Sequence, residues 1–489
     1  MTPDPILTHQ KLVAAQAELE TLRADNAALR EDNAALRAEM GKLREAIEKL
    51  QQVLEALQGR LSKDSHNSHK PPSSDGPKAP PRPPSAPSGR KRGGQPGREG
   101  KARPPLPEGS ESRRVEVKLE YCPHCGRPVP QDAITGTHVE RTLDLVQRLV
   151  EVTAFVLQEG ECPNCHHVVR APLPAEAGVA ELGPNLRALA AYLRAQGRMS
   201  IGALHFYFKE VLGVDISRGW LHESGNGVSE AVAATWEGLR EEIQRALVVN
   251  MDETGFGRAD RNWIWVALAA RTAFFHFSDT RSFEALKEIL PEDFAGVLCT
   301  DRYSAYRRLK GAMRQFCWAH LRRELVALSE CSKEDVSKLG KKLLADQERM
   351  FNLWHAFQDG KIDRQALRMQ SAIVMARLKR NLLAAAAMKH RPARNLGTAL
   401  VENWDKLWTF LRIEGVAPTN NGAERALRPL VIMKRIFQRL PSNGGKRFYE
   451  RLVSAGMTAR IRGVPFFQWL IKAFKANRMG EAPPALELA

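Results

Sequence analysis

Leucine recurs at every seventh residue near the start of the chain. It stands at Leu22 and at each seventh position after it to Leu57, and a second apolar series with the same spacing is interrupted by Asn26 and Asn33. A helix with such a repeat of about 3.5 residues buries one stripe against a partner helix. Residues 8–61 are therefore predicted to form a leucine-zipper coiled coil, and the asparagines in its seam favour two strands.

Charges beside this stripe predict the direction of the partner helix. In four successive heptads an acidic residue precedes a basic one by five places, as with Glu18 and Arg23 or Asp25 and Arg30. These places face each other across a parallel pair, whereas an antiparallel pair would oppose like charges. The sequence therefore predicts a parallel homodimer, because a single long surface helix would explain neither the register nor the charges.

Residues 62–112 contain almost no apolar side chains and are rich in Pro, Ser, Gly and basic residues. A segment that cannot bury apolar surface is predicted to be a disordered linker. Within it, Arg90, Lys91 and Arg92 form a candidate DNA-binding arm, suited to lie along phosphates or in a minor groove. Plain flexibility is the simpler interpretation of the same residues.

Two CxxC pairs follow within residues 113–172, joined by alternating, strand-like segments. They are Cys122 with Cys125 and Cys162 with Cys165. Four thiolates are the tetrahedral set that a structural Zn²⁺ binds, and a closed shell of sulfur leaves no position for chemistry. Redox chemistry would need only one pair, so we predict a zinc-binding domain. The adjacent histidines are interpreted as bystanders, although one of them could replace a cysteine.

Residues 180–243 carry apolar residues at helical spacing on both sides of Gly213. Two short helices around a glycine turn are typical of a helix-turn-helix DNA-binding domain. A plain packing unit explains the pattern equally well, because no base-contacting residue stands out.

Beyond residue 244, apolar runs with strand character end on acidic residues. One run ends on Asp252 and another on Asp301, with further strand-like and helical segments between them. Strand ends can place two carboxylates side by side, where a cation must compensate the like charges. Carboxylate oxygens suit Mg²⁺ or Mn²⁺, and two ions about 3.5 to 4 Å apart can promote phosphodiester displacement. Glu424, at the start of a helix, is the candidate third ligand, although each acid alone would be an ordinary surface carboxylate.

Charge then indicates the partner of this site. The formal net charge of +17 is concentrated in residues 60–103, with 11 basic against 3 acidic residues, and in residues 425–478, with 13 against 1. Two basic blocks suggest two places where phosphates are neutralised, so we expect a nucleic acid rather than mere surface solvation. Four residues of the second block have a spacing suited to a phosphate backbone: Arg425, Arg428, Lys434 and Arg435.

Composition limits the setting of the protein. A chain of 489 residues is expected to hold several domains. No run reaches the roughly 18 apolar residues of a membrane span, and no export leader is recognisable at the first residues. Because four of the seven cysteines form CxxC pairs, a reducing compartment is favoured. We therefore expect a soluble, cytoplasmic protein without a membrane partner.

Several motifs together resemble the DDE transposases of the insertion sequence 66 type. They are the zipper, the linker SHNSHKPPSSD with RKRGGQPG, the knuckles CPHCG and CPNC, and MDETGF, TDRYSAY, CWAHLRREL and NNGAERALRPLVIMKR. The resemblance spans nearly the whole chain and implies a multidomain α/β protein with an RNase H-like catalytic core over residues 244–440. Asp252, Asp301 and Glu424 match the acidic triad of the family.

Two segments complete this domain plan. Helical periodicity over about residues 332–416 indicates a helical insertion within the core. Residues 441–489 remain as a basic C-terminal region. The CWAH block implies a supporting role near the scissile DNA, rather than metal binding, for His320, Arg322 and Arg323, although His320 is equally well explained as a helix residue packed against the core.

The resemblance also implies an activity. It is cleavage at the ends of an insertion sequence, dependent on two Mg²⁺ or Mn²⁺ ions, and strand transfer of the resulting 3′-OH into target DNA. The implied partners are element ends, target DNA, a second copy of the chain bound through the zipper, and accessory proteins encoded by the same element. The implied location is the bacterial cytoplasm, in association with the nucleoid.

Two rival functions stay open at this stage. An RNase H-like nuclease or junction resolvase would share the triad without requiring the zipper or the zinc domain. A non-catalytic dimeric DNA-binding regulator would use the zipper, the knuckles and the basic linker. Strand joining separates the first rival from a transposase, and metal-dependent cleavage separates the second.

Overall fold

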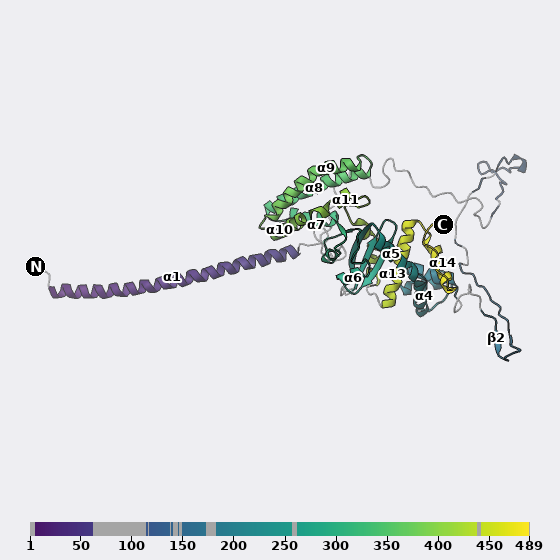
Figure 1. Ribbon diagram of the computed structural model, residues 1–489, viewed down its shortest axis with the longest axis horizontal. Coiled ribbons are helices and arrows are strands. Elements are labelled where there is room, and N and C mark those ends of the chain that lie inside the picture. Colours follow the sequence, from purple (N-terminus) through teal and green to yellow (C-terminus); the bar gives the residue numbers. More distant parts are fainter. Residues whose placement is uncertain are drawn as a thin grey trace. The chain divides into compact units, whose positions relative to one another are not determined.

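The computed structural model describes residues 5–61, 114–115, 117–136, 138–139, 145, 149–172, 182–256, 262–437 and 442–488. These residues have the mixed α/β architecture expected from the sequence (Figure 1). The predicted linker at 62–112, with its arm at Arg90, Lys91 and Arg92, lies outside the described residues. Within the described residues, no helix combines the length and the apolar character required to cross a membrane.

The chain divides into two compact units. The first comprises Met1–Arg82, His320–Lys361 and Gln370–Thr398, and the second comprises Pro83–Ala319, Ile362–Met369 and Ala399–Ala489.

Five helices lie wholly or mostly in the first unit. They are α1 (Pro5–Leu61), α7 (Trp318–Ser329), α8 (Glu334–Gln358), α9 (Arg364–Ala386) and α10 (Arg391–Glu402). Along α1, the leucines of the heptad series from Leu22 to Leu50 are 58–68% exposed. Between α8 and α9, the fully buried carboxylate of Asp346 accepts a hydrogen bond from Asn381 at 2.7 Å and pairs with Arg377 at 3.2 Å.

A five-stranded sheet forms the centre of the second unit. Its strands are β3 (Val248–Phe256), β4 (Asn262–Leu268), β5 (Ala273–Ser278), β6 (Val297–Thr300) and β7 (Met313–Phe316). Their order is β5-β4-β3-β6-β7. The first three strands along the chain pair antiparallel as a meander, and β6 and β7 then add in parallel on the other side of β3.

Both faces of the sheet are covered because its strands are apolar on both sides. One face, with Val266 and Phe275, packs against α12 (Asn421–Phe437) and α13 (Asn443–Arg462). The same core also contains buried residues of three further helices: α2 (Pro184–Ala195), α4 (Arg218–Ala231) and α14 (Phe466–Arg478). The other face, with Trp265 and Phe274, packs against α5 (Ala233–Arg245), α6 (Phe283–Lys287) and the 3₁₀ turn η3 (Ser304–Arg308).

Polar side chains cover the two edges of the sheet. On the β5 edge, three residues one helical turn apart on α13 accept hydrogen bonds from alternate main-chain N–H groups of the strand, at 2.6–3.0 Å: Thr458, Ser454 and Glu450. On the β7 edge, Gln315 binds the segment made of η4 (Trp404–Leu407) and α11 (Thr409–Arg412), since its side chain accepts from the N–H of Phe410 at 2.9 Å. Unpaired strand edges invite association, and these contacts remove that hazard.

The region before the sheet is helical, as the apolar spacing of residues 180–243 predicts. Helix α3 (Ile201–Glu210) packs with α2 and α4 around Leu204 and Phe208. Serine side chains cap α3 and α4, Ser200 for the first and Ser217 for the second. The break between these two helices contains Gly213, which has a φ of +69°.

Within the described part of residues 114–172, little regular structure is present. It includes the turn η2 (Gln131–Ala133) and two short antiparallel strands, β1 (Glu159–Glu161) and β2 (Val168–Arg170). The alternation expected to give strands around residues 138–158 does not do so over residues 149–158, which have no regular structure. These residues are mostly exposed, so no buried face selects a strand there.

Candidate active site

The pairing of β3 and β6 brings two aspartates close together. Val248 pairs with Val297, and Asn250 pairs with Cys299, in parallel. Asp252 lies two residues beyond Asn250 within β3, and Asp301 lies two residues beyond Cys299, just after the last residue of β6, so the two carboxylates come close enough to interact. The Asp252 side chain projects on the face of the sheet that packs against α12, because Asp252 lies opposite Val266, a residue of that face, and side chains alternate along a strand.

Helix α12 places a third carboxylate beside this pair. Glu424 lies in the first turn of the helix. The loop before the helix is held by Asn420, which is fully buried, donates from Nδ2 to the Met251 carbonyl oxygen at 2.6 Å and donates from its main-chain N–H to the Cys317 sulfur at 3.1 Å. The start of α12 is thus attached to the residue that immediately precedes Asp252.

The carboxylates interact electrostatically. Burial raises the pKa of Asp252 well above its ordinary value, and the negative charges of Glu253, Glu424 and Asp301 raise that pKa further. Proteins place like charges together at such a cost mainly where a function uses them. The donor set consists of carboxylate oxygens, which are the ligands that Mg²⁺ and Mn²⁺ prefer, so the chemistry of these residues fits a divalent cation.

The spacing of the carboxylates exceeds that of a single tight ligand group. Asp252, Asp301 and Glu424 do not form a set of ligand atoms that all lie within 4.8 Å of one another among the described residues. An oxygen of Glu424 instead lies within 4.8 Å of the Cys317 sulfur. A pair of ions about 3.5 to 4 Å apart requires no single cluster of all three carboxylates, because each ion has its own ligands.

Glu253 has a different environment from its neighbour Asp252. Its side chain is 1% exposed and projects to the opposite face of the sheet, where Tyr306 and Arg281 donate hydrogen bonds to its two oxygens. Burial and the charge of Asp301 raise the pKa of Glu253, and the Arg281 guanidinium opposes that rise. With both oxygens engaged, Glu253 anchors the sheet rather than offering a ligand.

Arg281 connects this anchor to the second aspartate. Its Nη2 lies 3.9 Å from Asp301 Oδ2, and its guanidinium stacks over the Tyr303 ring at 3.8 Å. Tyr303 in turn donates from its main-chain N–H to Asp301 Oδ1 at 2.8 Å and from its hydroxyl to the Arg281 carbonyl at 2.8 Å. Asp301 is therefore held on one oxygen and faces a cation with the other.

Arg314 supports the same segment from β7. Its Nη2 donates to the Thr300 hydroxyl at 2.6 Å and to the Asp301 carbonyl at 3.3 Å. Burial lowers the pKa of Arg314 to about 10, so the guanidinium stays charged at neutral pH. The fixed positive charge stabilises the main chain that carries Asp301.

The four basic residues of α12 that were predicted to bind DNA differ in their exposure. Arg425, Arg428 and Arg435 are exposed on its outer face. Lys434 is partly buried and donates to the Gly255 carbonyl at 2.7 Å, so it fastens α12 to the end of β3.

The residues predicted from the CWAH block all lie in α7. His320 is 8% exposed. Arg322 is exposed and donates to the Gln347 side chain at 3.0 Å, with Glu348 at 3.7 Å, while Arg323 is partly buried. Arg322 therefore already has partners on α8.

Each cysteine pair forms a knuckle of the same shape. In the first, the N–H of Cys122 bonds the Arg127 carbonyl at 2.8 Å, and in the second the N–H of Cys162 bonds the His167 carbonyl at 2.9 Å. Main-chain hydrogen bonds from Cys125 and His124 lower the pKa of Cys122, and those from Asn164 and Cys165 lower that of Cys162. Lowered thiol pKa values suit metal-binding thiolates.

The two knuckles do not join into one site. Among the described residues, no three of the four thiols lie within 4.8 Å of one another. Each knuckle provides two thiols suited to binding zinc. The group of four sulfur atoms expected from the sequence is not present as one cluster among the described residues.

Sequence reasoning missed Arg281, Asn420 and Tyr306. Tyr306 lies within the motif TDRYSAY, and Asn420 within NNGAER, so both were visible as parts of motifs without a role. Arg281 follows β5 and had no such signal. The role of Arg281 depends on its hydrogen bond to Glu253, which lies 28 residues earlier in the sequence.

Two uncharacterized proteins of Sinorhizobium fredii (strain NBRC 101917 / NGR234) are similar to the chain. Protein y4qI is 26% identical over 359 residues, which cover 66% of this chain and 64% of that protein. Protein y4hP is 23% identical over 409 residues, which cover 75% of this chain and 72% of that protein. The chain thus spans less than two thirds of y4qI.

Family models match two parts of the chain. Residues 9–104 match a family of unknown function (DUF6444). Residues 180–447, which include the sheet, α12 and the three carboxylates, match the family described as Transposase IS66 family. This second match covers more than half of the sequence. The chain therefore belongs to the transposase IS66 family.

Proposed function

We propose that the chain is a DNA transposase whose active site consists of Asp252, Asp301 and Glu424. One observation carries the proposal: the parallel pairing of β3 and β6 and the start of α12 bring Asp301 and Glu424 close enough to Asp252 that the charges of both raise its pKa. Membership of a transposase family supports the same reading.

The topology of the sheet supports an RNase H-like core. If the five strands are numbered in chain order from β3, their order across the sheet is 3-2-1-4-5. The second strand is antiparallel to the first, whereas the fourth and fifth strands are parallel to the first. Asp252 lies in the central strand, and Asp301 immediately follows the parallel neighbour of that strand.

Asp252, Asp301 and Glu424 would hold Mg²⁺ or Mn²⁺. Bound there, such ions would neutralise developing negative charge and help to deprotonate the attacking oxygen. The chain's own residues orient the carboxylates. Tyr303 and Arg281 fix Asp301, and Asn420 fixes the start of α12 against Met251.

The reaction consists of two phosphoryl transfers. In the first, water attacks a phosphorus at the element end, the bond from phosphorus to O3′ breaks, and a 3′-OH is released. In the second, that O3′ attacks a target phosphorus and displaces the O3′ of the target strand. Positioning and charge neutralisation are sufficient for such transfers, and no covalent enzyme intermediate is required.

Two further parts of the chain support synapsis of two DNA ends. The exposed leucine stripe of α1 would pair with a second copy as a parallel coiled coil. The two cysteine knuckles would share one structural Zn²⁺, which would bring them together.

Metal analysis of the purified protein should then find one zinc per chain. A Cys125→Ser/Cys165→Ser variant should lose this zinc, and the control variant Cys331→Ser should retain it.

A cleavage and joining assay tests the proposal. Labelled DNA carrying the candidate element ends is incubated with Mg²⁺ or Mn²⁺ and the wild type, Asp301→Asn or the exposed control Asp293→Asn. We expect the wild type and the control to nick and join, and Asp301→Asn only to bind. If none of the three cuts, even with the other proteins of the element added, the chain is a DNA-binding regulator. Cutting without joining identifies a nuclease.

A further inference from the structure

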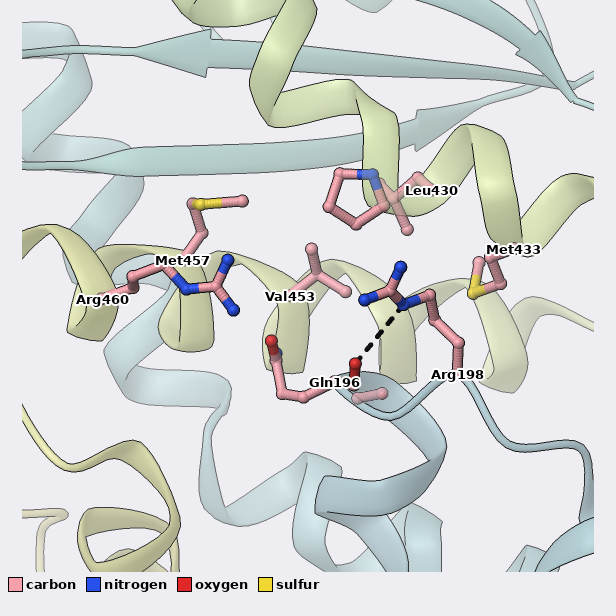
Figure 2. A pocket seen from close by; sticks show the side chains of 9 residues that line it. Gln196, Arg198, Leu430, Met433, Val453, Met457 and Arg460 are labelled. Carbon is pink, nitrogen blue, oxygen red and sulfur yellow. Dashed lines mark hydrogen bonds between the residues drawn. The ribbon is translucent and has the colours of Figure 1, made fainter. Parts of the chain in front are cut away.

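Two arginines face one cavity on the second unit, away from the carboxylates. The cavity is small and partly open to solvent, and it lies between α12, α13 and the turn that follows α2. Apolar side chains form its floor: Leu430, Met433, Val453 and Met457. Figure 2 shows the guanidinium groups of Arg198 and Arg460 directed at this floor from either side of Val453.

The turn that carries Arg198 is unusual. Arg198 has a φ of +57°, a left-handed conformation that is costly for any residue except glycine. Its neighbour Gly197 has no room for a side chain, because a Cβ there would lie 2.6 Å from a main-chain oxygen of α2. Gln196 ties the turn to α13 through a hydrogen bond to the Leu452 carbonyl at 3.0 Å, and Gly456 leaves space for that amide.

This strained turn holds Arg198 at the cavity but provides no negative charge that would neutralise its guanidinium group. Among residues 182–256, 262–437 and 442–488, neither Arg198 nor Arg460 forms an ion pair; the one side-chain contact of Arg198 is a long hydrogen bond to the Gln196 carbonyl, at 3.4 Å. The apolar floor offers no negative charge. Two uncompensated guanidinium groups at one cavity select an oxyanion, and their planar donors match phosphate.

The surface of α12 connects the cavity to the carboxylates. With about 3.6 residues per turn, the exposed face of the helix lies between Glu424 on one edge and Pro429 and Met433, which line the cavity, on the other. That face carries three exposed arginines: Arg425, Arg428 and Arg435. A DNA strand that leaves Glu424 across this face, which also exposes Ile432 and Ile436, therefore passes these arginines before it reaches the cavity.

We propose that Arg198 and Arg460 bind a backbone phosphate of the DNA whose cleaved end lies at Asp252, Asp301 and Glu424. This inference rests on the proposed function and adds a contact outside the carboxylate site. The contact would fix the direction of the DNA across α12. Since phosphate contacts position DNA without reading its sequence, the effect is on affinity and alignment rather than on base preference.

The salt dependence of DNA binding tests the inference. Anisotropy of a fluorescein-labelled duplex is measured with the full chain over a series of salt concentrations. Arg198→Gly is the main variant, because glycine relieves the left-handed turn and removes the charge. Arg198→Gly/Arg460→Gln removes both charges. Arg245→Gln is the control, since Arg245 is exposed and also carries one charge.

We expect the magnitude of the slope of log affinity against log salt to fall by about 0.9 in the double variant, which removes the one phosphate contact, and by a smaller amount in Arg198→Gly. The value for the double variant corresponds to roughly eightfold weaker binding at 0.1 M salt if the lines meet at 1 M. The melting temperature of Arg198→Gly should not decrease, whereas a purely structural role for Arg198 would lower it. Arg245→Gln should keep the wild-type slope.

Three other outcomes overturn the inference. If the wild type binds and cuts DNA and both variants keep its slope, the cavity does not bind DNA, although the transposase proposal stands. If inorganic pyrophosphate raises the melting temperature of the wild type but not of Arg198→Gly, with equal DNA slopes, the cavity binds a free phosphate ligand. If the wild type binds no DNA, both the inference and the proposed function fail.

Discussion

Asn420 donates a hydrogen bond from its side-chain nitrogen to the main-chain carbonyl oxygen of Met251, at 2.6 Å. Met251 immediately precedes Asp252, and Asn420 lies one helical turn before Glu424, whose N–H bonds the Asn420 carbonyl at 3.3 Å. One buried amide thus sets the distance between two of the proposed catalytic carboxylates.

Asn420→Ala should separate these elements. It leaves a buried carbonyl without its donor, which costs about 1 to 3 kcal/mol of folding free energy. Strand cleavage should fall by a larger factor than DNA binding, because alignment matters to the reaction more than to binding. Urea unfolding and single-turnover cleavage measure the two effects. The control is Asn403→Ala, whose amide also bonds a main-chain carbonyl, and equal loss of cleavage in both variants would contradict the account.

Arg281→Gln should destabilise the protein through Glu253. The carboxylate of Glu253 is 1% exposed and would lose its cation. Because Arg281 is partly exposed, we expect about 1 to 3 kcal/mol, below the range for a fully buried pair. A Glu253→Gln/Arg281→Gln variant removes both charges and should recover most of this loss. Urea unfolding of the single and double variants gives the coupling energy, and a coupling near zero would show that the pair does not act as a unit.

Asp252→Asn should stabilise the metal-free protein at neutral pH while abolishing cleavage. The pKa of Asp252 is raised above 3.8 in the folded protein. A raised carboxyl pKa contributes stability that is fully present below the unfolded value and is lost as pH rises through the folded value. At neutral pH the ionised group therefore opposes folding.

Melting curves in the presence of a chelator measure this effect. We expect Asp252→Asn to melt about 2 to 4 °C higher than the wild type at neutral pH, with a smaller gain as the pH falls. Asp293→Asn, an exposed control, should melt like the wild type. A lower melting temperature for Asp252→Asn would mean that the carboxylate is compensated in the metal-free protein.

The zipper prediction has a matched pair of variants. Leu29→Glu/Leu36→Glu places charges in the apolar seam of α1, whereas Ala28→Glu/Ala35→Glu places the same charges beside it. Light scattering after gel filtration should give a dimer for the wild type and the alanine variant, and a monomer for the leucine variant, because buried unpaired carboxylates are costly. A leucine variant that stays dimeric would assign dimerisation to another part of the chain.

The sequence predicted those features that depend on local pattern. Apolar runs located β3 and β6. Asp301 follows the end of β6 as expected, whereas the run that was expected to end on Asp252 continues as β3 to Phe256, so Asp252 lies inside that strand; the basic helix after Glu424 is α12. Alternation along β3 says that Asp252 and Glu253 face opposite sides, but which side holds the site depends on α12, which is 165 or more residues away.

Contacts between distant segments were not predictable in the same way. Lys434 looked like a phosphate ligand from its spacing, and the fold gives it a carbonyl partner on β3. No sequence pattern marked Arg281 as a site residue, because its role depends on tertiary contacts with Glu253 and Asp301. Register, helix placement and charge pairing are tertiary properties, and single-chain periodicity carries little information about them.

The most direct test of the three-carboxylate site uses Glu424, the member on α12. Strand cleavage by Glu424→Gln is compared with cleavage by the exposed control Glu414→Gln, at equal DNA occupancy and saturating Mn²⁺. We expect a loss of about 100-fold or more for Glu424→Gln, wild-type cleavage for Glu414→Gln, and unchanged DNA binding for both. Wild-type cleavage by Glu424→Gln would contradict the assignment of the site.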